Sequence, residues 1–214
     1  QTLKEYREQL KKSDEIVICS DVKLPVKLYS NISGPQDLEA VLQNGSDGIG
    51  LFRTEFLFMQ SSDLPSEEEQ FDVYSQVARA MKGKEVIIRT MDIGADKKTA
   101  CLVLPEEANP ALGKRAIRIC LDNTELFRTQ LRALLRAACF GNIKILYPMI
   151  TSEWEITEIE KQLGLAADEL KKRGIERGME RGKLLTLFEL VKNGLLTVSQ
   201  AASTAKLTEE QFRK

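Results

Sequence analysis

The sequence contains no histidine in its 214 residues. Without an imidazole, the chain cannot perform serine–histidine hydrolysis or accept a phosphoryl group on a histidine of its own. It has no apolar run approaching the roughly 18 residues of a membrane span, so we expect no transmembrane helix. The charged start, residues 1–8, lacks the apolar core of a signal peptide. We therefore expect neither a membrane protein nor a secreted one.

Cysteine is also scarce, with four residues far apart at Cys19, Cys101, Cys120 and Cys139. They show no metal-ligand spacing, so we expect reduced thiols that act as small core residues, and a cytoplasmic location. The 31 Lys and Arg residues nearly balance the 32 Asp and Glu residues, for a net charge of −1. Bulk charge therefore favours neither nucleic acid nor membrane as a partner.

Strand and helix patterns alternate from residue 26 to residue 150. The patterns predict strands at 26–30, 48–52, 85–90 and 143–147, and helices at 37–43, from 66 onward and at 124–140. Such alternation is typical of parallel strands joined by right-handed crossovers. It fits either a doubly wound sheet or a (β/α) barrel, and the strands found are about half of a TIM-type barrel.

The last quarter of the chain has a different amino-acid composition. An Arg-Gly pair recurs every four residues over 173–182, and residues 171–214 hold ten Lys and Arg against five Asp and Glu, a net charge of +5. Thr197 and Thr208 each begin a capping-box pattern typical of a short helix. We therefore predict an α/β chain with a lead-in helix and strand (1–25), a partial barrel (26–165) and a small all-α tail resembling a helix-turn-helix (166–214).

Three arginines follow the predicted strands or the long loop over 92–113. Arg53 and Arg89 stand at the carboxyl ends of strands, and Arg115 comes just after the loop. Parallel α/β folds bind ligands at that end of the sheet, and the planar fork of arginine suits phosphate and carboxylate groups. The pattern predicts an anion-binding site. The alternative is that each arginine forms an ordinary surface salt bridge.

Polar residues directly follow two of these arginines. Thr54 and Glu55 come after Arg53, while Asp92 and Asp96 come after Arg89. We interpret them as supporting residues whose side chains hold the arginines in place. The two aspartates could instead belong to a simple turn, or to a calcium loop whose remaining ligands are missing. The pattern indicates neither a catalytic residue nor a metal ligand.

Several segments together resemble a family of phosphoenolpyruvate-using enzymes. The matching stretches are GIGLFRTEFLFM at 48–59, LPSEEEQF at 64–71, IIRTMDIGADK at 87–97, NPALGKRAIR at 109–118, QLRALLRA at 130–137 and YPMI at 147–150. Pyruvate phosphate dikinase and phosphoenolpyruvate synthase share the Arg-Thr-Glu element. The whole set is more similar to enzyme I of the bacterial sugar phosphotransferase system, over roughly residues 1–165.

The resemblance implies a chemistry and a set of residues. Enzyme I transfers the phosphoryl group of phosphoenolpyruvate to a histidine, with Mg²⁺, and then to a phosphocarrier protein. By resemblance Arg53 and Arg89 bind the substrate phosphate, and Arg115 is a further candidate. The family's metal-binding Glu and Asp, its substrate Asn, its third Arg and its acid Cys come from the second barrel half, and its histidine from an N-terminal domain. None of these segments is found here.

We therefore interpret the chain as a fragment of a phosphoenolpyruvate–protein phosphotransferase that is not competent alone and would meet the carrier only through the missing domain. The open edges of half a barrel predict self-association, poor solubility or cover by another element. From about Arg173 the tail resembles the C-terminal helices of PD-(D/E)XK transposase-type nucleases. This leaves two alternatives, an interaction or DNA-binding module acting through the basic tail, or an inactive truncated fusion product.

Overall fold

The computed structural model describes residues 26–59, 63–94, 102, 104, 106–193 and 195–213. The predicted helix and strand within 1–25, Asp96, Cys19 and Cys101 lie outside the described residues. The chain divides into two compact units between Leu163 and Gly164, and each unit is described separately below. Within the described part, no helix is both long enough and apolar enough to cross a membrane.

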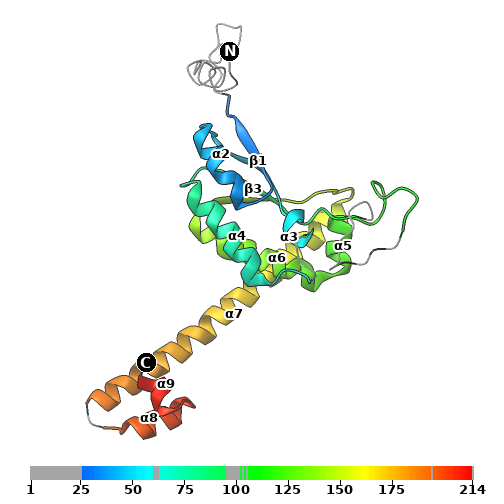
Figure 1. The fold of residues 1–214 in the computed structure, drawn as a ribbon. Helices are drawn as coiled ribbons and strands as arrows, with labels where there is room; N and C mark the ends of the chain where they lie inside the picture. Colours follow the sequence, from blue (N-terminus) through cyan, green and yellow to red (C-terminus); the bar gives the residue numbers. More distant parts are fainter. Residues whose placement is uncertain are drawn as a thin grey trace. The chain divides into compact units, whose positions relative to one another are not determined.

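The first unit is built on a sheet of four parallel strands (Figure 1). The strands are β1 (Tyr29–Ile32), β2 (Gly48–Arg53), β3 (Glu85–Arg89) and β4 (Asn142–Leu146), in the order β1-β2-β3-β4. Each strand pairs with the one before it, whereas a doubly wound sheet reverses its strand order. The predicted α/β fold, part of a (β/α) barrel, is confirmed.

Helices connect these strands. They are η1 (Pro35–Asp37), α2 (Leu38–Gln43), α3 (Glu55–Met59), α4 (Glu67–Ala80), α5 (Ile117–Asp122), α6 (Thr124–Ala137) and η2 (Ala138–Phe140).

The predicted start of the long helix at residue 66 is confirmed by a capping box. The Ser66 amide donates to the Glu69 carboxylate at 2.8 Å, and the Glu69 amide donates to the Ser66 hydroxyl at 3.3 Å.

Three predictions about local structure are wrong. The first strand begins at Tyr29 rather than at residue 26, because the backbone of Leu28 is bonded to Asp47 in the loop before β2, with both bonds at 2.8 Å. The short helix α3 lies where a loop was expected after the strand at 48–52, and α5 lies in a stretch for which no helix was predicted, since five or six residues are too few to show a helical repeat. Cys120 is buried as expected, but Cys139 is exposed.

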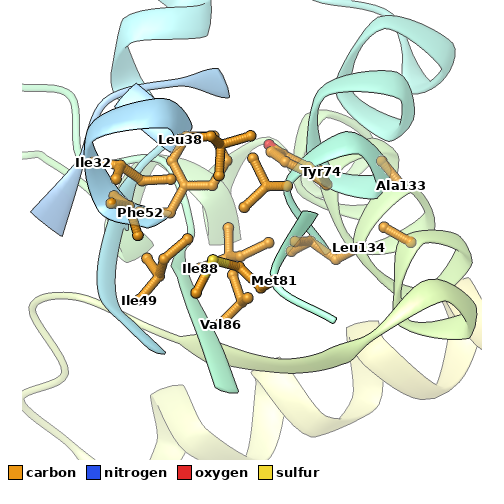
Figure 2. Close-up of a cluster of buried hydrophobic side chains, with 13 residues drawn as sticks. Ile32, Leu38, Ile49, Phe52, Tyr74, Met81, Val86, Ile88, Ala133 and Leu134 are labelled. Atoms are coloured by element: carbon orange, nitrogen blue, oxygen red, sulfur yellow. The ribbon is translucent and has the colours of Figure 1, made fainter. Parts of the chain in front are cut away.

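The main core lies between one face of the sheet and helices α2, α4 and α6. Figure 2 shows Phe52, Val86 and Ile88 of the strands against Tyr74 and Leu134 of the helices, all fully buried. The Tyr74 ring meets the Phe52 ring edge-on, with centroids 5.9 Å apart. Fully burying one large apolar side chain contributes about 1.5–3 kcal/mol, so this layer holds the strands to the helices.

A bulge in β2 decides which face of the sheet Arg53 occupies. The register pairs Ile49 with Val86, Phe52 with Ile88 and Arg53 with Arg89, with a shift between Ile49 and Phe52. Both Ile49 and Phe52 pack in the core, although strict alternation would put residues three apart on opposite faces. The extra residue therefore brings Arg53 to the face opposite the core, which Arg89 shares.

The second unit contains three helical segments. The helix α7 (Glu153–Lys192) runs into it, followed by α8 (Val198–Ala205) and α9 (Glu209–Arg213). A small core joins them, formed by Leu187, Ala201, Ala202 and Phe212. The capping boxes predicted at Thr197 and Thr208 are both present. The proposed boundaries at 25 and 165 stay a prediction.

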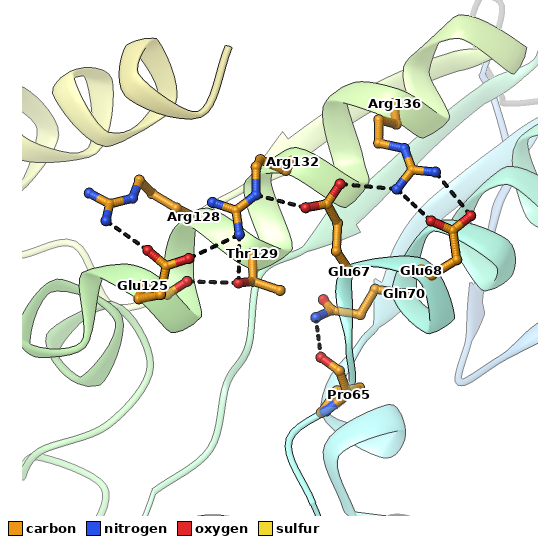
Figure 3. A network of polar contacts seen from close by, with 9 residues as sticks. All are labelled: Pro65, Glu67, Glu68, Gln70, Glu125, Arg128, Thr129, Arg132 and Arg136. Carbon is orange, nitrogen blue, oxygen red and sulfur yellow. Dashed lines mark hydrogen bonds and ion pairs between the residues drawn. The ribbon is translucent and has the colours of Figure 1, made fainter. Parts of the chain in front are cut away.

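A polar network joins α4 to α6 (Figure 3). Arg132, whose side chain is 5% exposed, donates from Nε to Glu67 at 2.8 Å and from Nη2 to Glu125 at 3.0 Å. Arg136 also contacts Glu67, at 3.0 Å. Hydrogen bonds from Arg128 and then Arg132 lower the pKa of Glu125. The N-terminal turn of α4, where a carboxylate is favoured, is thereby attached to α6.

We expect Arg132→Met to lower the free energy of unfolding by about 2 kcal/mol, measured by urea denaturation. Breaking a buried ion pair costs about 3–5 kcal/mol, and the exposure of Glu125 reduces that figure here. The control is Lys161→Met, which removes an ion pair to Glu158 from a lysine whose side chain is 63% exposed. Equal losses in the two variants would contradict a special role for Arg132.

Candidate anion-binding site

Arg53 and Arg89 end two neighbouring strands and stand directly opposite each other in the register of β2 and β3. Neighbouring strands lie about 4.8 Å apart, so two guanidinium groups on one face come close together. Like charges opposite each other in a sheet are destabilising. The arrangement is stable only if carboxylates or a bound anion compensate the charge.

Two carboxylates hold Arg89. Its Nη2 lies 2.6 Å from Oε1 of Glu55, and its Nη1 lies 3.1 Å from Oδ2 of Asp92. Both carboxylates are largely buried, with side-chain exposures of 5% and 12%. Charge-assisted bonds at such distances are stronger than neutral ones. They fix the orientation of the Arg89 guanidinium at the end of β3.

Arg115, which directly precedes Ala116 and helix α5, also contacts this cluster. Its Nη2 and Nε lie 3.0 Å and 3.3 Å from Oδ1 of Asp92, so this carboxylate bridges two arginines. Ala116 has a positive φ of 52°, and its amide donates to the Ile93 carbonyl at 3.0 Å. Strained backbone of this kind persists where the surroundings demand it, and it gathers at functional sites.

Arg53 differs from the other two arginines. Among the described residues it makes no ion pair, and its buried Nε has no hydrogen-bond partner there. Its guanidinium lies over the Phe56 ring, 5.1 Å from the centroid. The Nε of Arg89 is likewise buried and unpartnered within the described part of the chain. A buried donor without a partner lowers stability by about 1–3 kcal/mol. An acceptor atom of a bound ligand could bond to these two N–H groups and remove that cost.

A further carboxylate lies near Arg53. The backbone N–H of Ser33 donates to Asp37 at 2.7 Å and is the main reason that the pKa of Asp37 is lowered, while the charge of Arg53 is the smallest cause.

The cluster of Arg53, Arg89 and Arg115 with Glu55 and Asp92 carries three positive and two negative charges. The site therefore suits an anion through its aligned donors more than through a large excess of charge.

Comparison with known proteins adds to this geometry. The family model described as PEP-utilising enzyme, PEP-binding domain, where PEP is phosphoenolpyruvate, matches residues 7–200. The chain belongs to this family. The matched region includes all three arginines of the site.

Relatives of this chain include phosphoenolpyruvate-protein phosphotransferases. That of Bacillus subtilis (strain 168) is 45% identical over 195 residues, which cover 83% of this chain and 34% of the relative. That of Staphylococcus carnosus (strain TM300) is 52% identical over 151 residues, 71% of this chain and 26% of the relative. The chain thus spans about a quarter to a third of these relatives. The resemblance to enzyme I is confirmed, and that of the tail to nucleases stays a prediction.

The structure adds Gln130 to the residues around this arginine cluster. Its fully buried side chain contacts Thr54 and the backbone of Met91, next to the arginine-bearing strand ends. Sequence reasoning missed it, although a polar residue among the apolar positions Phe127, Leu131 and Leu134 of an amphipathic helix was an available signal. Thr54, Glu55 and Asp92 lie with the arginines, while Asp96 is outside the described residues.

The described residues do not form a magnesium site. No group of three His, Cys, Asp or Glu residues among them could hold a metal ion. Glu55 and Asp92 are both bonded to arginines, which leaves their oxygens poorly placed for a cation. Burial raises the pKa of Cys120 to about 12, so this thiol is unsuited to act as an acid or nucleophile at neutral pH.

A cavity of about 300 Å³ in the first unit is distinct from the arginine cluster. It is lined by Phe58, Leu64, Pro65, Ser66, Gln70, Asn123, Glu125, Leu126 and Thr129. None of the three arginines lines it, and its only charged side chain is an acidic one. It therefore does not provide the anion site.

Proposed function

We propose that this chain supplies the phosphate-binding arginines of the PEP site of a phosphoenolpyruvate–protein phosphotransferase. The observation that carries the proposal is the side-by-side placement of Arg53 and Arg89, each with a buried Nε–H donor unpartnered among the described residues. PEP carries a phosphate and a carboxylate, the two groups that guanidinium forks bind in bidentate fashion. The family match over residues 7–200 supports the same substrate.

The two arginines have different tasks in this proposal. Arg89 is held by Glu55 and Asp92, so it presents a fixed donor to the phosphate without reorganising when the ligand arrives. Arg53 makes no ion pair within the described structure and can close on the anion. Arg115 acts chiefly by holding Asp92. Positioning and charge neutralisation of this kind are the main protein contributions to phosphoryl transfer.

The acceptor of the phosphoryl group lies outside this chain, which contains no histidine. We therefore propose that the chain binds PEP but does not transfer its phosphoryl group, and that contact with a phosphocarrier protein requires other parts of the full-length relatives. A cytoplasmic location belongs to the same proposal. No observation favours the DNA-binding alternative, and the two relatives described above are both named as phosphotransferases.

Arg53→Ala should weaken PEP binding by about tenfold to a hundredfold in isothermal titration calorimetry, because a charge-assisted contact is lost. The fold should remain intact, since Arg53 has no ion pair among the described residues. Arg89→Ala should weaken binding as well, but it should also lower the melting temperature by leaving the buried Glu55 without this ion pair.

The matched control is Arg79→Ala. It removes one positive charge from the last turn of α4, where Arg79 stacks on Phe140 at 3.9 Å from the ring centroid. That turn precedes β3, so it lies toward the opposite end of the strand from Arg89. Unchanged affinity in Arg53→Ala, or an equal loss in Arg79→Ala, would contradict the proposed site.

We also propose that the β4 edge drives self-association. Among the described strands β4 pairs only with β3, and its residues alternate between exposed and half-buried. Leu146, at its end, is 36% exposed. A parallel strand with an unpaired edge and an apolar face is a template for another chain.

Light scattering should therefore show an apparent mass that rises with protein concentration. Leu146→Lys should reduce that rise, whereas Leu165→Lys, at a leucine on α7 that is 40% exposed, should not. A monodisperse monomer at all concentrations would refute self-association through this edge.

A further inference from the structure

One fully buried side chain connects the two strand ends that carry the arginines. Oε1 of Gln130 accepts a hydrogen bond from the Met91 amide at 3.0 Å, and its Nε2 donates to Oγ1 of Thr54 at 3.2 Å. Thr54 in turn donates from Oγ1 to the carbonyl of Arg89 at 2.8 Å. Gln130, Thr54 and Met91 are all 0% exposed. Helix α6 is thus bonded to the ends of both β2 and β3.

The orientation of the Gln130 amide follows from its partners. A backbone N–H can only donate, so the atom facing Met91 must be the carbonyl oxygen. The amide nitrogen then faces Thr54 and the hydroxyl of Tyr74, 3.1 Å away. The Tyr74 hydroxyl in turn donates a hydrogen bond to Oε1 of Gln70 at 3.1 Å. Each group in this chain of bonds has one defined role, and reversing the Gln130 amide would break it.

These bonds lie next to Arg53, Arg89 and Asp92, three of the charged residues of the site. Thr54 directly follows Arg53, the bonded carbonyl belongs to Arg89, and Met91 directly precedes Asp92. The guanidinium groups of Arg53 and Arg89 repel each other, so the spacing of their strand ends has to be imposed by neutral bonds behind them. From a single position on α6, Gln130 bonds next to both strand ends.

We propose that Gln130 is a positioning residue, which sets the spacing of Arg53 and Arg89 through Thr54 and Met91. This inference rests on the proposed PEP site and deepens it. A merely structural network would make every member equally important for ligand affinity. If Gln130 is a positioning residue, loss of its bonds to the strand ends lowers ligand affinity, whereas loss of its bond to Tyr74 on α4 does not.

The test compares four variants of the full chain. Gln130→Met keeps the length of the side chain but removes all its hydrogen bonds, and Thr54→Val removes only the hydroxyl. Thr54→Ser is the conservative variant that retains the hydroxyl. Tyr74→Phe is the matched control, because it removes a hydroxyl from the same buried network without touching the bonds to Thr54 and Met91. Affinity for PEP is measured by calorimetry at a temperature where every variant is folded.

We expect Gln130→Met to weaken PEP binding by about tenfold and Thr54→Val by about threefold, the effects of one or two lost hydrogen bonds. Thr54→Ser and Tyr74→Phe should stay within about twofold of the unchanged chain. Hydrogen exchange gives a second readout that needs no ligand. Exchange of the Met91 amide should accelerate in Gln130→Met and remain slow in Tyr74→Phe.

Two results would overturn the inference. One is an equal loss of affinity in Tyr74→Phe and Gln130→Met, which would indicate a purely structural network. The other is unchanged protection of the Met91 amide in Gln130→Met. If the unchanged chain does not bind PEP, the proposed function fails, and the exchange experiment then decides by itself whether Gln130 holds the strand ends.

Discussion

The site depends on the repulsion between two guanidinium groups placed side by side at the ends of β2 and β3. Arg53 and Arg89 are register partners on one face of a parallel sheet, so their positive charges cannot move apart without breaking the ladder. The structure compensates only part of this charge. Glu55 and Asp92 bind Arg89, while Arg53 makes no ion pair within the described structure. The uncompensated part favours a bound anion, and in the proposed function the aligned N–H donors of Arg53 and Arg89 contribute most of the affinity.

Three features hold the charges in that unfavourable arrangement. The bulge in β2 turns Arg53 to the face of Arg89, the bridge from Asp92 to Arg115 fastens the loop after β3, and Gln130 bonds to the backbone behind both strands. Gln130 lies on α6, so its two bonds depend in turn on the packing of α4 and α6 against the sheet. Arg132 on α6 binds Glu67 on α4 and thereby helps to hold these two helices together.

Much of this structure could be predicted from the sequence. The parts that could not be predicted were missed for physical reasons. The alternating strands and helices, and the capping boxes at Ser66, Thr197 and Thr208, are local signals that do not depend on the rest of the fold. The two strand-ending arginines could be placed at one edge because parallel strands share a direction. The bulge could not be predicted, since it arises from the pairing of β2 with β3 and has no local signature. Gln130 and the helix α3, which carries Glu55, were missed because tertiary contacts define them.

The most direct test of the account follows the N–H groups of the arginine Nε atoms during a titration with PEP. In spectra of arginine-labelled protein, the signals of Arg53 and Arg89 can be assigned with the variants Arg53→Lys and Arg89→Lys. The account predicts that both signals shift with one common dissociation constant, while the signal of Arg136, which is bonded to Glu67 and Glu68, stays in place. Saturable binding that leaves the Arg53 signal unmoved would contradict it.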